Sequence, residues 1–253
     1  MTLPLGASCA TTEQPDSELS NPDMVRIEAG SYTGLYKQQG EADVIAVAPF
    51  YLDKFQVSNQ QFLDFTLRVD KWSKAKIKPI FADASYLHQL EQHEIADIAK
   101  QAVVNVSWFA ATAYCKSAGK RLPTLDEWEY TAQASATEKD GSKSVEFREK
   151  ILQWYSTPAA DALADVTNGE ANYWGVHGMH GVVWELVRDF NTALVTGESR
   201  GDSALDKQLF CGAGATSSID PSDYAAFMRY ALRSSYSSSY TLNSLGFRCA
   251  KDL

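Results

Sequence analysis

The most constraining part of this sequence is the stretch from Asn105 to Gln133, in which two helical segments meet at a short corner that contains a proline. Ser107 is expected to begin the first helix, because its hydroxyl can accept a hydrogen bond from a free backbone N–H group of the first turn. Gly119 suits the left-handed position at which a helix ends. Thr124 and Glu127 have the spacing of a capping box, which predicts that a second helix begins just after the corner.

The second helix has one face to bury. Leu125, Trp128 and Ala132 recur at helical spacing and fall on the same side of it. Physical reasoning alone therefore predicts a well-specified helical corner at this point of the chain. It indicates no function by itself.

Other elements are expected on both sides of the corner. The apolar run Val44–Ala48 predicts a buried strand, and Ser58 or Asn59 is expected to cap a helix that continues to Val69. Asp83–Lys100 is expected to be helical. Short strands, helices and long glycine-bearing loops alternate along the chain, which indicates an α+β domain.

Two segments are distinctive in composition. Lys71–Lys78 alternates charged and apolar residues, which suits either a basic edge strand or a solvated surface. Ser144–Tyr155 predicts a helix with Phe147, Ile151 and Trp154 on one stripe.

The composition excludes several classes of protein. The chain is 45% hydrophobic and 22% charged, which is ordinary for a soluble globular protein with a sizeable core. It has no run of about 18 apolar residues, so no transmembrane helix is expected. A formal net charge of −9 argues against nucleic acid or an anionic membrane as the main partner.

Five sequence blocks together resemble the formylglycine-generating enzyme family, also called sulfatase-modifying factors. The corner carries the pattern SW-x5-YC-x3-GKRLPT-x2-EWEY. The other four blocks follow the family's order along the chain: Met24–Gly30 (MVRIEAG), Pro49–Phe65 (PFYLDKFQVSNQQFLDF), Gly181–Asp189 (GVVWELVRD) and Leu245–Asp252 (LGFRCAKD). The resemblance implies a single domain over residues 24–253 with a C-type-lectin-like topology. The helix expected at Ser144–Tyr155 departs from the family pattern.

The N-terminal residues 1–23 are expected to form a flexible leader. Leu3–Ala10 is similar to the tail of an export signal, which indicates a periplasmic or secreted protein; a cytosolic protein with an irregular N-terminus is the alternative. Cys9 is a candidate for lipid attachment, although the residues before it fit the usual lipidation motif poorly.

The chain has four cysteines. The resemblance implies a disulfide between Cys115 and Cys249, which would require an oxidising compartment. Cys211 can pair with Cys9, remain buried as a small apolar residue, or act as a reactive thiol.

The family's copper chemistry needs two thiolates, because soft sulfur ligands stabilise Cu(I). The matching region, Cys211–Ser235, contains no cysteine after its first residue. Ser217 and Ser218 stand near the first ligand position and Ala225 near the second. Oxygen and methyl groups would bind Cu(I) poorly, so no copper is predicted.

The sequence also contains candidate ligands for other metals. By resemblance, Gly181, Val183 and Glu185 match three positions of the family's calcium site, but its asparagine ligand is replaced by glycine. The alternative is that Glu185 is a buried carboxylate paired with Arg229 or Arg233.

His177 and His180 lie in a Gly-rich stretch and have a spacing that can chelate a transition metal, with Glu185 or Asp189 completing the site. Such histidines more often bond to backbone in a tight turn.

The family's substrate groove is expected to be polar and aromatic, a composition typical of binding surfaces. Arg233 can bind a carboxylate in a bidentate fork, or Arg233 and Trp184 can instead support the core. The groove candidates are Ser217, Ser218, Trp184, Arg229, Arg233, Ser234 and Tyr236.

Two classes of function remain. The first is an exported family member with a degenerate copper site, which acts as a binding, accessory or maturation factor and takes an unidentified protein, peptide or small molecule in the groove. The second is an oxidoreductase that oxidises a small-molecule chromophore, as relatives in siderophore maturation are associated with doing. Conversion of a sulfatase cysteine to formylglycine is the weaker form of the second class.

Overall fold

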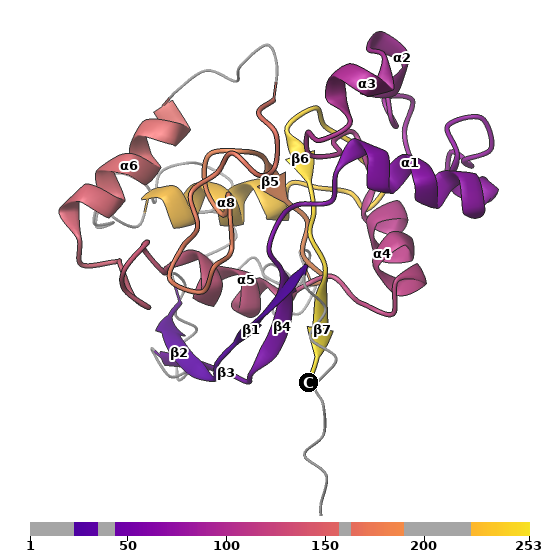
Figure 1. Ribbon diagram of the computed structural model, residues 1–253. Helices are drawn as coiled ribbons and strands as arrows, with labels where there is room; N and C mark the ends of the chain where they lie inside the picture. Colours follow the sequence, from indigo (N-terminus) through magenta and orange to yellow (C-terminus); the bar gives the residue numbers. More distant parts are fainter. Residues whose placement is uncertain (1–22, 35–43, 157–162, 190–223) are drawn as a thin grey trace, which may run out of the picture.

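The computed structural model describes residues 23–34, 44–156, 163–189 and 224–253 (Figure 1). These residues form an α+β domain of short strands, helices and long connecting loops. The strands are β1 (Met24–Ile27), β2 (Gly30–Thr33), β3 (Val44–Val47), β4 (Phe50–Asp53), β5 (Trp184–Glu185), β6 (Leu245–Gly246) and β7 (Ala250–Asp252). The helices are α1 (Asn59–Arg68), the 3-10 turn η1 (Asp70–Trp72), α2 (Gln89–Gln92), α3 (Ile95–Ile98), α4 (Trp108–Ser117), α5 (Leu125–Ala132), α6 (Val145–Ser156) and α8 (Tyr224–Ser234).

The central sheet brings the two ends of the described chain together. It has the strand order β1-β4-β7, with antiparallel pairing throughout. Leu52 of β4 lies opposite Val25 of β1 on one side and Ala250 of β7 on the other. Strands β2 and β3 pair in a separate two-stranded sheet, and β5 pairs with β6 in parallel.

The helix starts agree with the sequence predictions. The Ser58 side chain accepts a hydrogen bond from the N–H of Gln61 at the start of α1, and Ser107 does the same with Ala110 in α4. A complete capping box between Thr124 and Glu127 begins α5. These three predictions are confirmed, because each depends only on contacts within one turn.

One predicted helix is wrong, and one predicted strand differs from expectation in its burial. Asp83–Lys100 is not one helix but turns and the short helices α2 and α3, because Leu87 has a φ of 52° and His93 is extended. The strand expected at Val44–Ala48 is present as β3, but it is not buried as expected. Val44 is 55% exposed, because among the described strands β3 pairs with β2 alone. The basic segment Lys71–Lys78 forms the end of η1 and turns rather than an edge strand.

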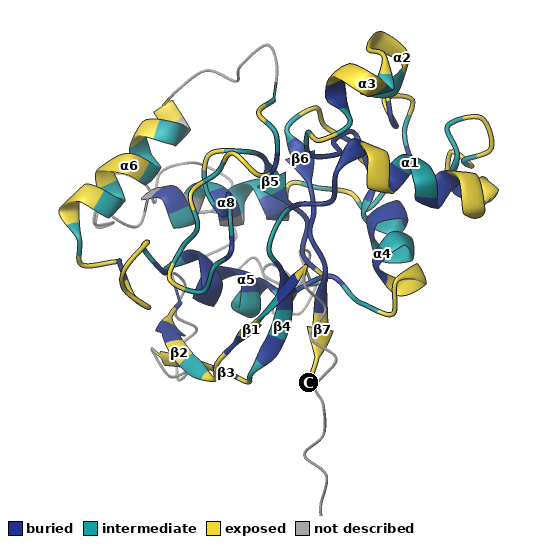
Figure 2. Cartoon of the chain, in the orientation of Figure 1, coloured by how far each residue is buried: buried dark blue, intermediate teal, exposed yellow. Residues whose placement is uncertain are grey.

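Two clusters of buried side chains form most of the core. One lies among α1, α4 and β6 and contains Phe62, Phe65 and Phe247. The other lies between the central sheet and α5 and contains Trp128. Tyr236 packs against both clusters. Figure 2 shows buried residues on β4 and along α5, whereas much of α6 is exposed.

A disulfide joins Cys115 of α4 to Cys249, just before β7, with the Cα atoms 5.6 Å apart. This is the pairing that the family resemblance implies. It links residues 134 positions apart in the sequence. Among the helices that the structure describes, none has the length and apolar character needed to cross a membrane.

Candidate functional site

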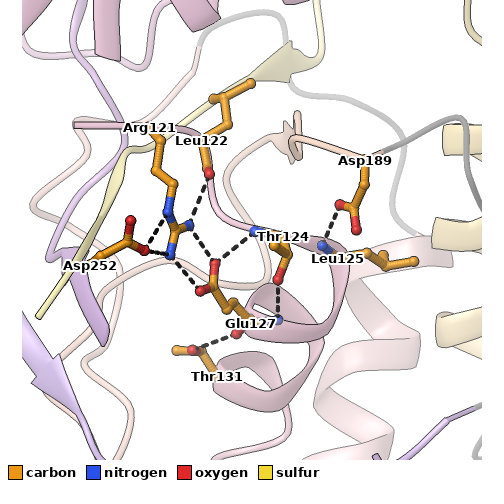
Figure 3. Close-up of polar contacts among 8 residues, drawn as sticks. All are labelled: Arg121, Leu122, Thr124, Leu125, Glu127, Thr131, Asp189 and Asp252. Atoms are coloured by element: carbon orange, nitrogen blue, oxygen red, sulfur yellow. Dashed lines mark hydrogen bonds and ion pairs between the residues drawn. The ribbon is translucent and has the colours of Figure 1, made fainter. Parts of the chain in front are cut away.

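A network of polar contacts fixes the start of α5 (Figure 3). Arg121 lies before the corner, and its Nη1 and Nη2 atoms each donate to a different oxygen of Glu127 at 2.7 Å. Nη2 also donates to Asp252 of β7 at 2.6 Å. Oε2 of Glu127 accepts from the backbone N–H of Thr124 at 2.8 Å. Arg121 therefore connects the capping box of α5 to the C-terminal strand.

Asp189 attaches the segment GVVWELVRD to the same helix start. Its Oδ1 accepts from the backbone N–H of Leu125 at 2.7 Å (Figure 3). The N–H of Arg188 donates to the carbonyl of Pro123, also at 2.7 Å. Burial raises the pKa of the Asp189 carboxyl above its ordinary value. Two of the blocks that carry the family resemblance thus lie side by side.

Glu185 lies at the centre of a fully buried polar cluster. Its Oε1 accepts from Gln56 at 2.8 Å and from Nη2 of Arg248 at 2.7 Å. Its Oε2 accepts from the Trp128 indole and from Nε of Arg248, both at 2.8 Å. The alternative that Glu185 is a buried, paired carboxylate is confirmed, but the partner that it named, Arg229 or Arg233, is wrong. Its partner is Arg248, from the LGFRC block, because β5 and β6 run side by side.

This cluster bears on the calcium candidates Gly181, Val183 and Glu185. Each carboxylate oxygen of Glu185 already accepts two hydrogen bonds, so a calcium ion there would have to displace at least one of these donors. Over the described ranges, no three His, Cys, Asp or Glu side chains come together in a group that could bind a metal.

The two histidines of the Gly-rich loop bond to backbone. Nδ1 of His177 lies 2.7 Å from the carbonyl oxygen of Gly169, and Nε2 of His180 lies 2.9 Å from that of Ala132. Burial, and secondly the positive charge of Arg229, lower the pKa of His180 to about 4. Both histidines therefore make the backbone contacts that were the alternative to chelating a metal.

Arg229 and Arg233 of α8 share one carboxylate, that of Glu129 on α5. Nη2 of Arg229 lies 2.6 Å from Oε2 of Glu129, and Nη1 of Arg233 lies 2.6 Å from Oε1. The Arg233 guanidinium also lies 4.6 Å from the ring centroid of Trp128. Burial alone would raise the pKa of Glu129, but the two arginines outweigh it and lower the pKa to about 2.

Sequence reasoning missed Glu129. A signal for it was present, because Glu129 follows Leu125 by four residues and so shares the buried face of α5. The structure places all three side chains of the cluster below the surface. Arg233 thus attaches α8 to α5. Of the two roles considered for this residue, the structure shows the one in which it supports the core.

The remaining groove candidates are dispersed. The ring of Trp184 on β5 lies 5.5 Å from that of Trp154 on α6. Tyr236 is partly buried between the core clusters, and burial raises the pKa of its hydroxyl. Ser234 ends α8. Ser217 and Ser218 lie outside the described residues.

A cavity of about 670 Å³ lies among β2, α5, α6 and α8. Glu129, His180 and Arg229 form part of its wall, and α6 supplies Phe147 and Ile151. Of the groove candidates whose side chains the structure describes, Arg229 lines this cavity. The extra helix therefore forms one side of the space beside the Glu129 cluster.

Two of the four cysteines are not free thiols in this structure. Cys115 and Cys249 are bonded to each other. The other two cysteines, Cys9 and Cys211, lie outside the described residues, and a site would need both of them. Cu(I) is stabilised by soft donors, which hydroxyl and methyl groups cannot replace.

Comparisons with known proteins agree with the geometry. The family of sulfatase-modifying factor enzyme 1-like domains matches residues 10–253, beginning inside the stretch expected to form a leader. The formylglycine-generating enzyme of Bos taurus is 25% identical, and the alignment covers 90% of this chain and 74% of the relative. The inactive C-alpha-formylglycine-generating enzyme 2 of Bos taurus is 26% identical, with 84% of this chain and 80% of the relative covered.

A solved structure shows the same fold. The crystal structure of CarF superposes with a TM-score of 0.51 at 14% identity, covering 91% of this chain and 98% of that one. The match over nearly the whole sequence, together with the five blocks and their arrangement, shows that this chain is a divergent member of the formylglycine-generating enzyme, or sulfatase-modifying factor, family.

Proposed function

We propose that this protein is an exported binding or maturation factor of the family and that it works without copper bound by thiolates. The observation that carries the proposal is the Cys115–Cys249 disulfide, which removes two of the four cysteines from metal chemistry. A two-thiolate site would then require Cys9 to meet Cys211. Neither lies between Gly214 and Arg229, where the family resemblance places both ligands.

The disulfide also supports export. Disulfides that serve structure persist mainly in oxidising compartments, such as the periplasm or the extracellular space. Cys115 and Cys249 are both fully buried and connect the first core cluster to the end of the central sheet. A structural bond at this position fits a periplasmic or secreted protein. Lipid attachment at Cys9 is a further part of the proposal, testable by intact mass of the protein from membranes.

The ligand site of the proposal is the cavity beside the Glu129 cluster. Its volume of about 670 Å³ falls within the range of about 300–1,000 Å³ typical of small-molecule pockets. Two buried ion pairs to Glu129 fix one wall, α8, against another, α5. A site whose walls are fixed before binding loses little conformational entropy when a peptide or small molecule enters.

The test is a turnover assay. The protein is incubated with a peptide carrying a sulfatase motif, oxygen and copper, and the peptide is then weighed by mass spectrometry, with an active formylglycine-generating enzyme as the positive control. The proposal predicts an unchanged peptide mass. A mass loss that corresponds to conversion of cysteine to an aldehyde would overturn it.

The cavity size also favours a second candidate, oxidation of a small-molecule chromophore. Oxygen uptake with dihydroxyaromatic and aromatic amine probes tests it. Uptake that requires the protein, and that a bulky residue at Ala226 in the cavity wall abolishes, would replace the binding role with an oxidoreductase role.

A further inference from the structure

The walls of the cavity differ in chemical character. Polar residues of β2, including Ser31 and Thr33, form one side. The opposite side is α6, which contributes the apolar side chains of Phe147, Ile151 and Leu152. All three are only partly buried by the protein itself. An apolar ligand surface placed against them would bury area that now faces the cavity, which is favourable at about 25 cal/mol per Å².

The charged residues of the cavity favour an anion. Lys143, Arg148 and Arg229 carry positive charge, whereas Glu129 and Asp140 carry negative charge. The Glu129 carboxylate is already bound by two guanidinium groups, so it offers little attraction to a cation. Asp140 lies on an exposed loop and accepts a hydrogen bond from the backbone N–H of Ser142.

Two of the cations are placed at the α6 end of the cavity. Lys143 lies just before the helix and is exposed, and Arg148 lies on its first two turns and is partly buried. Arg148 follows Phe147 directly and precedes Ile151 by three residues. A single helix therefore presents both a positive group and an apolar stripe to the same space.

The cavity wall also contains a neutral histidine. His180 lines the wall, and its pKa is lowered by burial and then by the charge of Arg229. The ring is neutral at pH 7 and so adds no positive charge of its own. Its Nε2 is directed to the carbonyl oxygen of Ala132.

We infer that this cavity binds an amphipathic organic anion, with its carboxylate, sulfonate or similar group near Lys143 and Arg148 and its apolar body against the α6 stripe. This inference rests on the proposed binding function and names its ligand class. Because α6 lies where the sequence departs from the family pattern, the ligand class is expected to be particular to this chain.

A pair of matched dyes tests the inference. The anionic probe is 1-anilinonaphthalene-8-sulfonate, and the uncharged probe of nearly the same shape is N-phenyl-1-naphthylamine. Affinity for each is measured by fluorescence titration of the wild-type protein and of the double variant Lys143→Gln/Arg148→Gln. The matched control is Lys116→Gln/Lys150→Gln, which changes the net charge equally at exposed positions that do not line the cavity.

Removing the two cations is expected to weaken binding of the anionic dye by roughly tenfold and to leave the neutral dye unchanged. The control variant should bind both dyes like the wild type. Ala226→Trp, which fills the cavity from α8, should abolish binding of both dyes. Near-ultraviolet circular dichroism verifies that each variant is folded.

Equal anion affinity in the two double variants would overturn the inference, as would dye binding that survives Ala226→Trp. Neither result bears on copper. Equal anion affinity in the two double variants would reject the ligand class alone, whereas dye binding that survives Ala226→Trp would also count against this cavity as the binding site. Conversely, formylglycine formation in the turnover assay would overturn the function and leave the dye result standing.

Discussion

Nη2 of Arg248 lies 2.7 Å from Oε1 of Glu185, and neither side chain exposes any surface to solvent. Arg248 also donates to the backbone carbonyls of Asp53, Lys54 and His177. The Arg248 side chain thus forms hydrogen bonds with groups from three distant segments of the chain. In a low-dielectric interior, such a pair is stable only because every charge and lone pair has a partner.

Removing one member of this buried ion pair should strongly destabilise the fold. Arg248→Met leaves Glu185 as an uncompensated buried charge, and we expect the free energy of unfolding to fall by about 3–5 kcal/mol. Urea unfolding followed by circular dichroism measures the change. Lys150→Gln is the control, because it removes an exposed ion pair with Glu170 and should cost less than about 1 kcal/mol.

The double variant Glu185→Gln/Arg248→Met removes both charges and should recover part of that loss. If Arg248→Met were no more destabilising than Lys150→Gln, the buried pair would not have the role described.

The disulfide is expected to contribute strongly to stability. A bond between residues 134 positions apart restricts the unfolded chain, and in the chain-entropy account this stabilises the fold by about 5 kcal/mol. Cys115→Ala/Cys249→Ala should therefore lower the midpoint of urea unfolding markedly. Adding a reductant should lower the wild-type midpoint but not that of the variant. A wild-type midpoint that is insensitive to full reduction would contradict the prediction.

Acid should weaken the contact between α5 and α8. Burial raises the pKa of Glu129, but Arg229 and Arg233 outweigh it and lower the pKa to about 2. A carboxyl with a lowered folded-state pKa stabilises the protein above its unfolded value, 4.5, and this contribution is lost as the pH falls toward about 2. The full contribution is on the order of 3 kcal/mol.

The measurement is the pH dependence of the unfolding free energy in the wild type and in Glu129→Gln. The variant should be less stable at pH 7, and the difference between the two proteins should shrink below pH 4.5. A difference that stays constant down to pH 2 would show that Glu129 is not paired as described.

His180 should produce a second loss of stability on acidification, in a higher pH range than that of Glu129. Its folded pKa is lowered from 6.5 to about 4, chiefly by burial and secondly by Arg229. The unfolded state therefore binds more protons between these values, and stability falls by up to about 1.4 kcal/mol per pH unit as the pH drops from 6.5 toward 4. His180→Gln should flatten this part of the profile. An unchanged profile in the variant would assign the loss to another group.

Much of the local structure could be predicted from sequence, because local chemistry determines it. The caps at Ser58, Ser107 and Thr124 depend on groups within four residues of each other. Gly119 has a φ of +68°, as its position after α4 predicts. The helix at Val145–Ser156 follows from an apolar stripe in the sequence.

Contacts between distant segments could not be predicted in the same way. As the alternative to a calcium ligand, Glu185 was assigned a partner among the arginines of α8. It pairs with Arg248 instead, since the choice depends on how β5 and β6 align. Glu129 instead takes both arginines. The exposure of Val44 likewise depends on β3 having β2 as its sheet partner, which no local pattern in Val44–Ala48 specifies.

The most direct test of the whole account is a Cu(I) titration of the protein with its Cys115–Cys249 disulfide intact, in competition with a chromophoric Cu(I) chelator. The Cys9→Ser and Cys211→Ser variants are titrated beside the wild type. We predict that the wild type removes no more copper from the chelator than either variant does. Tight binding of one Cu(I) per chain that both variants lose would contradict the account, because it would show that two thiolates meet at one ion.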